Sequence, residues 1–322
     1  MTSILPRYLI KLAKNIVTTF IGLISVLILP RSLGPADYGN LHFIRKSFET
    51  LFGFIDLNAS TAHFVYSSKN ENSKNFTQFH IIYCLIIGAI MFLFISVLAT
   101  TGILQIMFPD QELLYVYLGL ILGYSVYLFI NLTNLSDSKE LTVGFEKRNI
   151  SIMLISLILL LVLYFAGIIN LFYIFGYYII INLLLIIISI KYLKANGVLN
   201  FNFRDFYFSK LKGIIRYYYN FSSPLFVASI FTFFILFFER WFLQTIGGSV
   251  EQGFFNLAFR VGAISIIITD AMSQIYQQTI SKAHGQNNLK DIRDNLEKIN
   301  IFYCISAVIA VFFSSIPKNS LT

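Results

Sequence analysis

The sequence predicts an all-α fold, a polytopic membrane helix bundle of about nine transmembrane helices. Hydrophobic residues make up 57% of the chain, charged residues only 12%, and the mean hydropathy is +0.72. These values differ strongly from those of soluble domains. Apolar runs of roughly 20 residues, the length that crosses a bilayer, recur along the whole chain. Because the runs are continuously apolar, they do not match the alternating pattern of membrane β-barrel strands.

The expected spans follow one another with short connections. They cover residues 8–32, 38–66, 77–103, 112–135, 149–167, 170–192, 219–246, 252–280 and 300–316. A turn at Ala166 and Gly167 separates the fifth span from the sixth. The first span begins next to Arg7, Lys11 and Lys14 and lacks the short apolar core and cleavage site of a signal peptide, so we expect it to remain in the mature chain.

Basic residues concentrate in every second connection, which indicates the orientation in the membrane. These connections hold Lys69, Lys74, Lys139, Lys147, Arg148, Lys191, Lys194, Arg204, Lys210, Lys212, Arg216, Lys282, Lys290, Arg293 and Lys298. The opposite connections hold only Arg31 and Lys318 as basic residues. We therefore expect the basic loops and the N-terminus to be cytoplasmic. The net charge of +8 follows mostly from this topology and indicates no nucleic-acid partner.

Residues 197–218 differ from the spans around them, because aromatic and basic residues interleave there. This pattern is typical of a helix that lies in the cytoplasmic headgroup layer in contact with membrane lipids. An ordinary linker with long basic side chains reaching to the interface would have the same composition.

Two similar stretches indicate an internal repeat. GPADYG at residues 34–39 and GSVEQG at residues 248–253 both follow an apolar helix, and each has glycines five residues apart. The offset is 214 residues. At the same offset, Lys46 corresponds to Arg260 and Asp56 to Asp270.

The repeat predicts how the chain is divided. One period contains six helices, an even number, so both copies enter the membrane in the same direction and are related by an axis along the membrane normal. We expect an N-terminal six-helix lobe at residues 1–196, an amphipathic linker at 197–218, and a partial C-terminal lobe of three helices at 219–322. The second copy is thus shorter than the first, which indicates a truncated chain or a natural shortened product.

Polar residues in the second span predict a cavity. His42, Lys46, Glu49, Gly53, Asp56, Ser60 and His63 are spaced by three or four residues, so they share one face of a continuous helix. The eighth span carries Asn256, Arg260, Asp270, Gln274 and Gln277 in the same way. An ionisable group at membrane depth costs on the order of 2.5 to 3.5 kcal/mol by insertion scales, so such faces normally line a bundle interior or a watery cavity. We expect a cavity between the two lobes.

Basic groups in this cavity would bind an anion such as a diphosphate, since guanidinium and ammonium groups bind phosphate oxygens strongly. The candidate substrate-binding residues are Lys46, Arg260, Arg45 and Asn131, and the candidate ion-coupling carboxylates are Asp56, Glu49 and Asp270. A structural ion pair between Lys46 and Glu49 is the alternative. Glu239 and Arg240 are open to the same two interpretations.

Other chemistry has no signature in the sequence. The four histidines have no metal-ligand spacing, and Cys84 and Cys304 form neither a CxxC motif nor a disulfide framework. We therefore expect no metal and no cofactor. A P-loop and a large loop that could house an active site are also missing, so the sequence does not indicate an enzyme.

Two motifs carry a family resemblance. LPRSLGPADYGNL followed by LFGFIDLNAS, and later ERWFLQTIGGSVEQGFFNLAFR, resemble the Wzx-type O-antigen and polysaccharide flippases of the MOP superfamily, which includes the MATE transporters. The resemblance implies an alternating-access transporter in the bacterial inner membrane. Its substrate would be an undecaprenyl-diphosphate-linked oligosaccharide, moved to the periplasmic leaflet with an ion gradient, and other polysaccharide-assembly proteins are implied partners. Asn58 departs from the glycine common in the family.

Three other functions remain open at this point. A MATE-like exporter of small cations shares the fold but is expected to have a more acidic cavity. A membrane-embedded polysaccharide polymerase would be an enzyme with a large periplasmic loop. A shortened chain could also be a scaffold for other envelope proteins.

Overall fold

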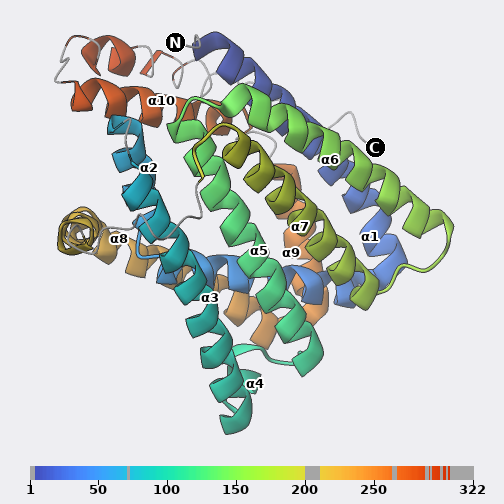
Figure 1. Ribbon diagram of the computed structural model, residues 1–322. Coiled ribbons are helices and arrows are strands. Elements are labelled where there is room, and N and C mark those ends of the chain that lie inside the picture. The colour runs from blue at the N-terminus through green and yellow to red at the C-terminus, as the bar shows by residue number, and fades with distance from the viewer. Residues whose placement is uncertain are drawn as a thin grey trace.

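The computed structural model describes residues 4–70, 73–199, 211–262, 267–286, 290, 292–297, 300–301 and 304. Its helices are α1 Ile4–Ile55, α2 Ala59–Lys69, α3 Lys74–Thr101, α4 Ile103–Met107, α5 Leu113–Ser138, α6 Thr142–Phe165, α7 Leu171–Ala195, α8 Leu211–Ile246, α9 Gly248–Gly262 and α10 Ile267–Gly285. Within the described residues, six helices are long and apolar enough to cross a membrane: α1, α3, α5, α6, α7 and α8. The prediction of an all-α membrane bundle is confirmed (Figure 1).

The first two predicted spans are joined in α1, which bends at Gly34. Gly34 has φ 80° and ψ 164°, a conformation that glycine adopts without steric cost. The residue 214 positions later, Gly248, has φ 73° and separates α8 from α9. The two glycines that open the similar sequence stretches therefore both mark a break between consecutive helices.

The prediction of one continuous helix over residues 38–66 is wrong. α1 ends at Ile55 and α2 begins at Ala59, because Leu57 and Asn58 have φ of 50° and 61°. Asparagine tolerates this left-handed conformation, whereas leucine adopts it rarely. Asp56 lies at the break.

The middle of the chain follows the prediction closely. α3, α5, α6, α7 and α8 cover the third to seventh predicted spans, and Gly167, with φ 67°, separates α6 from α7. α8 already begins at Leu211, so residues 211–218 extend the seventh span rather than form part of a separate linker helix.

The eighth predicted span, residues 252–280, includes residues 263–266, which lie outside the described residues. α9 ends at Gly262 and α10 begins at Ile267. The ninth predicted span, residues 300–316, lies almost entirely outside the described residues. Neither α9 nor α10 meets the length and hydropathy of a candidate span.

α1 organises the packing. A large apolar core forms where α1 packs on α5, α6 and α7 and α3 packs on α5, with Phe48, Met91, Leu122 and Phe175 among its buried side chains. We call α1–α7 the N-terminal segment and α8–α10 the C-terminal segment. α9 packs along α1 in the most extensive helix contact of the described chain, and α10 lies across the ends of α1 and α2 (Figure 1).

The two segments cross at a pair of glycines, which we call the glycine crossing. A Cβ atom on Gly39 would overlap the backbone oxygen of Ser249, and one on Gly253 would lie 2.5 Å from the backbone oxygen of Pro35. The contacts are reciprocal, because Gly39 and Pro35 correspond to Gly253 and Ser249 at the 214-residue offset. A contact between two related units across a two-fold axis has this reciprocity.

Candidate functional site

A cavity of about 610 Å³, cavity 1, lies between α1 and α8. Its charged lining residues are Lys46, Glu49, Glu239 and Arg240, and its uncharged lining includes Thr50, Asn58, Ser229, Thr232, Phe54 and Phe233. Two carboxylates and two basic groups therefore face one space. Glu49 is the only predicted ion-coupling residue among its lining residues.

Glu49 forms two ion pairs within α1. Lys46 Nζ lies 2.5 Å from Glu49 Oε2, and Arg45 Nε lies 2.8 Å from Glu49 Oε1. The side chain of Lys46 is 42% exposed, compared with 17% for Glu49. Lys46 is thus both paired, as the structural interpretation expects, and open to cavity 1, as the functional one expects.

Arg240 belongs to α8 and is buried. Its Nη1 donates to Asn256 Oδ1 at 2.6 Å, and its guanidinium lies 4.6 Å from the ring centre of Phe255 and 5.5 Å from that of Phe259. These contacts tie α8 to α9. Arg240 is therefore held by an amide and two aromatic faces of the adjacent helix.

A second cavity of about 360 Å³, cavity 2, is lined by α1, α6, α7 and Arg260 of α9. Its polar lining residues are Arg45, Arg260, Thr18, Thr19, Ser25, Ser156, Tyr177, Tyr178 and Asn182. Among the residues that the structure describes, its lining includes two arginines and no carboxylate. The guanidinium of Arg45 lies 5.1 Å from the ring centre of Tyr178, and Arg260 Nη1 has a long 3.5 Å contact with the oxygen of Gly22.

Lys46 and Arg260 thus line different cavities. Neighbouring helix residues point about 100° apart, so Arg45 faces cavity 2 while Lys46 faces cavity 1. Lys46 and Arg260 correspond at the 214-residue offset. Cavity 2 therefore joins Arg260 with Arg45 rather than with Lys46.

Asp56 lies in a buried polar network and is not among the lining residues of either cavity. Its carboxylate accepts hydrogen bonds from the backbone and side chain of Ser60 and from the hydroxyl of Tyr127. Asn131 is also buried, and its side chain bonds to His80 and to the backbone oxygen of Tyr127. Asn131 lines neither cavity, so its predicted role in substrate binding has no support from its position.

Asp270, the third predicted carboxylate, is a residue of α10, and its side chain lies outside the described ones. Within the described part of the chain, no group of histidine, cysteine, aspartate and glutamate side chains is arranged to hold a metal ion.

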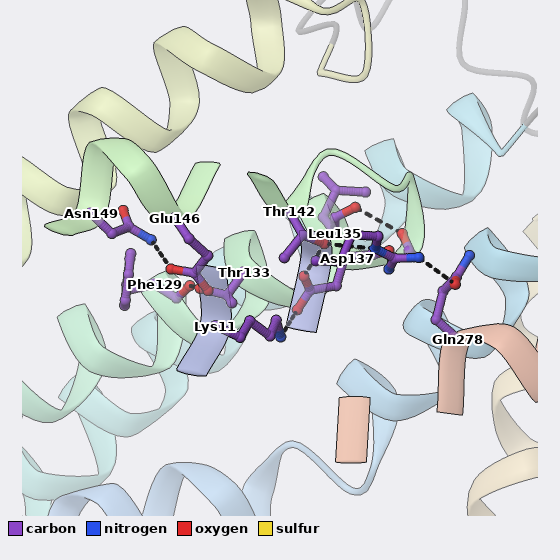
Figure 2. Close-up of polar contacts among 11 residues, drawn as sticks. Lys11, Phe129, Thr133, Leu135, Asp137, Thr142, Glu146, Asn149 and Gln278 are labelled. Atoms are coloured by element: carbon purple, nitrogen blue, oxygen red, sulfur yellow. Dashed lines mark hydrogen bonds and ion pairs between the residues drawn. The ribbon is translucent and has the colours of Figure 1, made fainter. Parts of the chain in front are cut away.

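A charged cluster near the start of α1 joins the two segments, and we call it the polar bridge (Figure 2). Lys11 Nζ lies 2.5 Å from Asp137 Oδ2, and both side chains are almost fully buried. Arg7 donates to Thr142, to the backbone oxygen of Asp137 and, at 3.0 Å, to Gln278 of α10. The sequence reveals Arg7 and Lys11 only as orientation signals, because their partners lie more than 120 residues away.

A surface ion pair extends the polar bridge. Lys282 Nζ of α10 lies 2.5 Å from Glu140 Oε1, in the connection between α5 and α6. Burial by itself would raise the pKa of Glu140, but the hydrogen bond and charge of Lys282 lower it below its ordinary value. Both segments therefore contribute charged groups to this contact.

A family described as polysaccharide biosynthesis protein matches residues 8–276, which is most of the chain. The chain belongs to this family. It is the family of the Wzx-type flippases of the MOP superfamily, so the resemblance of the two sequence motifs is confirmed. No curated protein matches this chain.

Among solved structures, the family member is similar to a mutant of the Vibrio cholerae MATE transporter VcmN. The TM-score is 0.70 at 14% sequence identity, and the match covers 97% of this chain and 73% of the transporter. At this identity the likeness concerns the fold. Family and fold together are those of multi-pass membrane transporters.

Proposed function

We propose that this chain moves undecaprenyl-diphosphate-linked oligosaccharide units across the bacterial inner membrane, from the cytoplasmic to the periplasmic leaflet. The observation that carries the proposal is cavity 2, which Arg45 and Arg260 both face. Arg45 is already paired with Glu49, whereas no carboxylate among the described lining residues balances Arg260. An arginine at membrane depth is costly unless it is paired or hydrated. An anionic ligand that enters the cavity would balance the charge.

The diphosphate is the part of the substrate that fits cavity 2. Guanidinium groups bind phosphate oxygens through planar, charge-assisted hydrogen bonds. Tyr177, Tyr178 and Asn182 add neutral polar groups on α7. The polyprenyl tail would remain in lipid, beside exposed apolar residues of α6 and α7 such as Ile155 and Leu183.

The transport step is a rocking of two duplicated units that alternates access between the leaflets. The two helix-breaking glycines and the reciprocal contacts of the glycine crossing support a duplication with lobes at residues 1–196 and 219–322. We propose that the N-terminus is cytoplasmic, as the basic loops indicate. Tags near residues 72, 143 and 288 should then report the cytoplasm, and tags near residues 109 and 248 the periplasm; reversal at two of these sites would refute this orientation.

A MATE-like export of cationic compounds is the second candidate, and one observation favours it. Cavity 1, the larger of the two, has Glu49 and Glu239 in its lining, and carboxylates attract cations. Lys46 and Arg240 in the same lining oppose this attraction. We therefore rank this function second.

One assay separates the two functions. The chain is reconstituted in vesicles that contain a labelled undecaprenyl-diphosphate oligosaccharide, and a glycan-cleaving enzyme added outside measures how much substrate reaches the outer leaflet. Parallel vesicles contain a fluorescent organic cation. Protein-dependent movement of the lipid-linked glycan is the expected result. Movement of the cation without movement of the glycan would overturn the proposal.

Lys46 offers a test inside cavity 1. Replacing it should not expose an unpaired carboxylate, because Glu49 keeps its ion pair with Arg45. We expect Lys46→Ala to insert and fold normally but to transport the glycan more slowly, and Lys46→Arg to retain more activity. Loss of folded protein in Lys46→Ala, restored in Lys46→Arg, would show that Lys46 serves structure alone.

A further inference from the structure

A second set of buried titratable groups lies where α1 ends and α2, α3, α5 and α8 meet, and none of its members lines cavity 1 or cavity 2. Its members are Asp56, His63, His80, Cys84, Tyr127 and Tyr218, and all are buried. Four helices contribute to it, α2, α3, α5 and, from the C-terminal segment, α8, and Asp56 lies at the break that follows α1. Buried ionisable groups within membrane helices are costly and commonly mark proton or ion pathways.

The carboxylate of Asp56 accepts three hydrogen bonds. Its Oδ1 accepts from the Ser60 hydroxyl at 2.7 Å and from the Tyr127 hydroxyl at 2.7 Å, and its Oδ2 accepts from the Ser60 backbone nitrogen at 2.9 Å. Three donors therefore converge on the two oxygens of one buried carboxylate.

His80 has partners on both ring nitrogens. Asn131 donates its amide nitrogen to the oxygen of Tyr127, so its Oδ1 is free to accept from His80 Nε2 at 2.7 Å. The Nε2 atom must then carry the hydrogen, and Nδ1 of neutral His80 accepts from the hydroxyl of Tyr218 at 3.0 Å. Cys84 connects His80 to Tyr127, with contacts of 3.7 Å and 3.5 Å.

His63 limits how much positive charge this network can hold. Its ring stacks on that of His80 with the centres 4.2 Å apart and the planes 7° apart. Two imidazolium rings at this distance would repel strongly in a poorly hydrated interior. His63 Nε2 contacts the hydroxyls of Thr77 and Ser67, whereas its buried Nδ1 has no partner. The pair can therefore hold one proton but not two.

Other charged groups around the pair are few. Lys139 donates to the backbone oxygens of Ser67 and Asn70, and its charge disfavours a positive charge on His63. Tyr83 donates to the backbone oxygen of Asp56, and Tyr66 and Phe76 stack near His63. Asp56 is the anion that acts on His80.

We propose that the stacked rings of His63 and His80, together with Asp56, form a buried binding site for a single proton. The proton comes from water and forms an N–H bond at Nδ1 of His80, and no other covalent bond forms or breaks. Tyr218 then has to accept a hydrogen bond where it previously donated one. Because Tyr218 belongs to α8, protonation changes a contact between the N-terminal and C-terminal segments.

Proton binding itself does not depend on the proposed transport function, but its coupling to transport does. An alternating-access transporter can use a proton if protonation favours one arrangement of its halves. Tyr218 and the bond of Asn58 to Ser229 both connect the N-terminal segment to α8 near this site. A proton bound at this site would therefore change contacts between the N-terminal segment and α8 and so favour one arrangement of the two segments.

The test is a nuclear magnetic resonance titration of the full chain with isotope-labelled histidine. The chain has four histidines, so His42→Gln with His284→Gln leaves only His63 and His80. We expect the two rings to take up one proton in a single coupled transition as the pH is lowered. Two rings that stay neutral, or that titrate independently, would overturn the proposal.

Tyr218→Phe in the same background tests the link to α8, and Tyr219→Phe is the matched control, because Tyr219 is exposed. Tyr218→Phe removes one hydrogen bond from neutral His80 and one from charged His80, and the bond to the charged form is the stronger of the two. The midpoint of the histidine titration should therefore move to lower pH by about half a unit or more. The control should not move it. An unchanged midpoint in Tyr218→Phe would refute the link.

The glycan assay in vesicles distinguishes a failure of the proposed transport function from a failure of its proposed coupling to a proton. If the chain transports the glycan, a pH gradient should alter the rate, and Tyr218→Phe should reduce that pH effect at least about twofold while Tyr219→Phe does not. Glycan transport with an unchanged pH effect would overturn the coupling alone. A normal histidine titration without glycan transport would overturn the proposed function alone.

Discussion

At the glycine crossing the N-terminal and C-terminal segments touch through backbone atoms, whereas at the polar bridge they touch through long side chains. From Arg7 to Gly34, α1 rises by roughly 40 Å, so the two contacts lie far apart on the molecule. Gly39 and Gly253 leave no space for a side chain. Arg7, Gln278 and Lys282, by contrast, can exchange their partners for water one bond at a time.

This difference indicates different roles in a rocking transporter. Backbone atoms in contact fix the separation of two helices, so the glycine crossing suits a pivot. Hydrogen bonds between long polar side chains can be exchanged for hydrogen bonds to water. The polar bridge therefore suits the end of the transporter at which the two segments separate and come together. Such a division is consistent with rigid units that rotate about a packed contact.

The largest expected effect comes from Asp137, which holds the polar bridge within the N-terminal segment. Asp137→Ala removes the carboxylate partner of buried Lys11 and the acceptor of the Thr142 hydroxyl. Breaking a buried ion pair from one side costs about 3 to 5 kcal/mol. Thermal unfolding in detergent should show the loss, and Asp294→Ala, at an exposed site, is the control. An Asp137→Ala protein as stable as the control would show that the ion pair of Lys11 and Asp137 does not stabilise the polar bridge.

A smaller effect is expected at the glycine crossing. Gly39→Ala and Gly253→Ala each force backbone atoms apart, and overpacking of this kind costs typically about 1 to 3 kcal/mol. Gly176→Ala is the matched control, because its added methyl group would meet nothing within 4 Å. If the crossing is reciprocal, both variants lower the melting temperature by similar amounts. A lower melting temperature in only one of the two variants would contradict the two-fold relation of the crossing.

The smallest effect concerns the ion pair of Glu140 and Lys282 at the edge of the polar bridge. The lowered pKa of Glu140 means that its stabilising effect is present above its ordinary value, near 4.5, and is lost as the pH falls through the lowered value. Both side chains are partly exposed, so we expect at most about 1 kcal/mol. Glu140→Gln should be less stable than the parent at pH 7 and equal to it near pH 3. A difference that persists at pH 3 would contradict this role.

The sequence predicts the regular helices well and their interruptions unevenly. Long apolar runs identify α3, α5, α6, α7 and α8, and Gly167 marks a turn that is visible in the sequence. The break at Asp56 to Asn58 lies inside an apolar run, where hydropathy has no signal for it. Its only sequence mark is an Asp-Leu-Asn triplet. Asp56 is bonded to Ser60 nearby, but its other bonds come from Tyr127 and Tyr83, which are distant in sequence.

The candidate site shows the same limit. Helical spacing correctly places Glu49 within reach of Arg45 and Lys46, because all three lie on one helix. The spacing of Arg45 and Lys46 also implies that they point in different directions, a consequence the cavity prediction overlooks. The contact of Arg45 with the space around Arg260 depends on how α9 crosses α1, which no local pattern determines.

The central claim is that Arg45 and Arg260 hold the substrate diphosphate in cavity 2, and Arg260 tests it most directly. The measurement is the rate of glycan translocation in vesicles, normalised to folded protein, for Arg260→Ala, Arg260→Lys and the exposed control Arg31→Ala. A lost charge-assisted hydrogen bond predicts a fall of at least about tenfold in Arg260→Ala. Arg260→Lys should retain more activity, and the control should stay within about twofold of the parent. Full activity of folded Arg260→Ala would contradict the account.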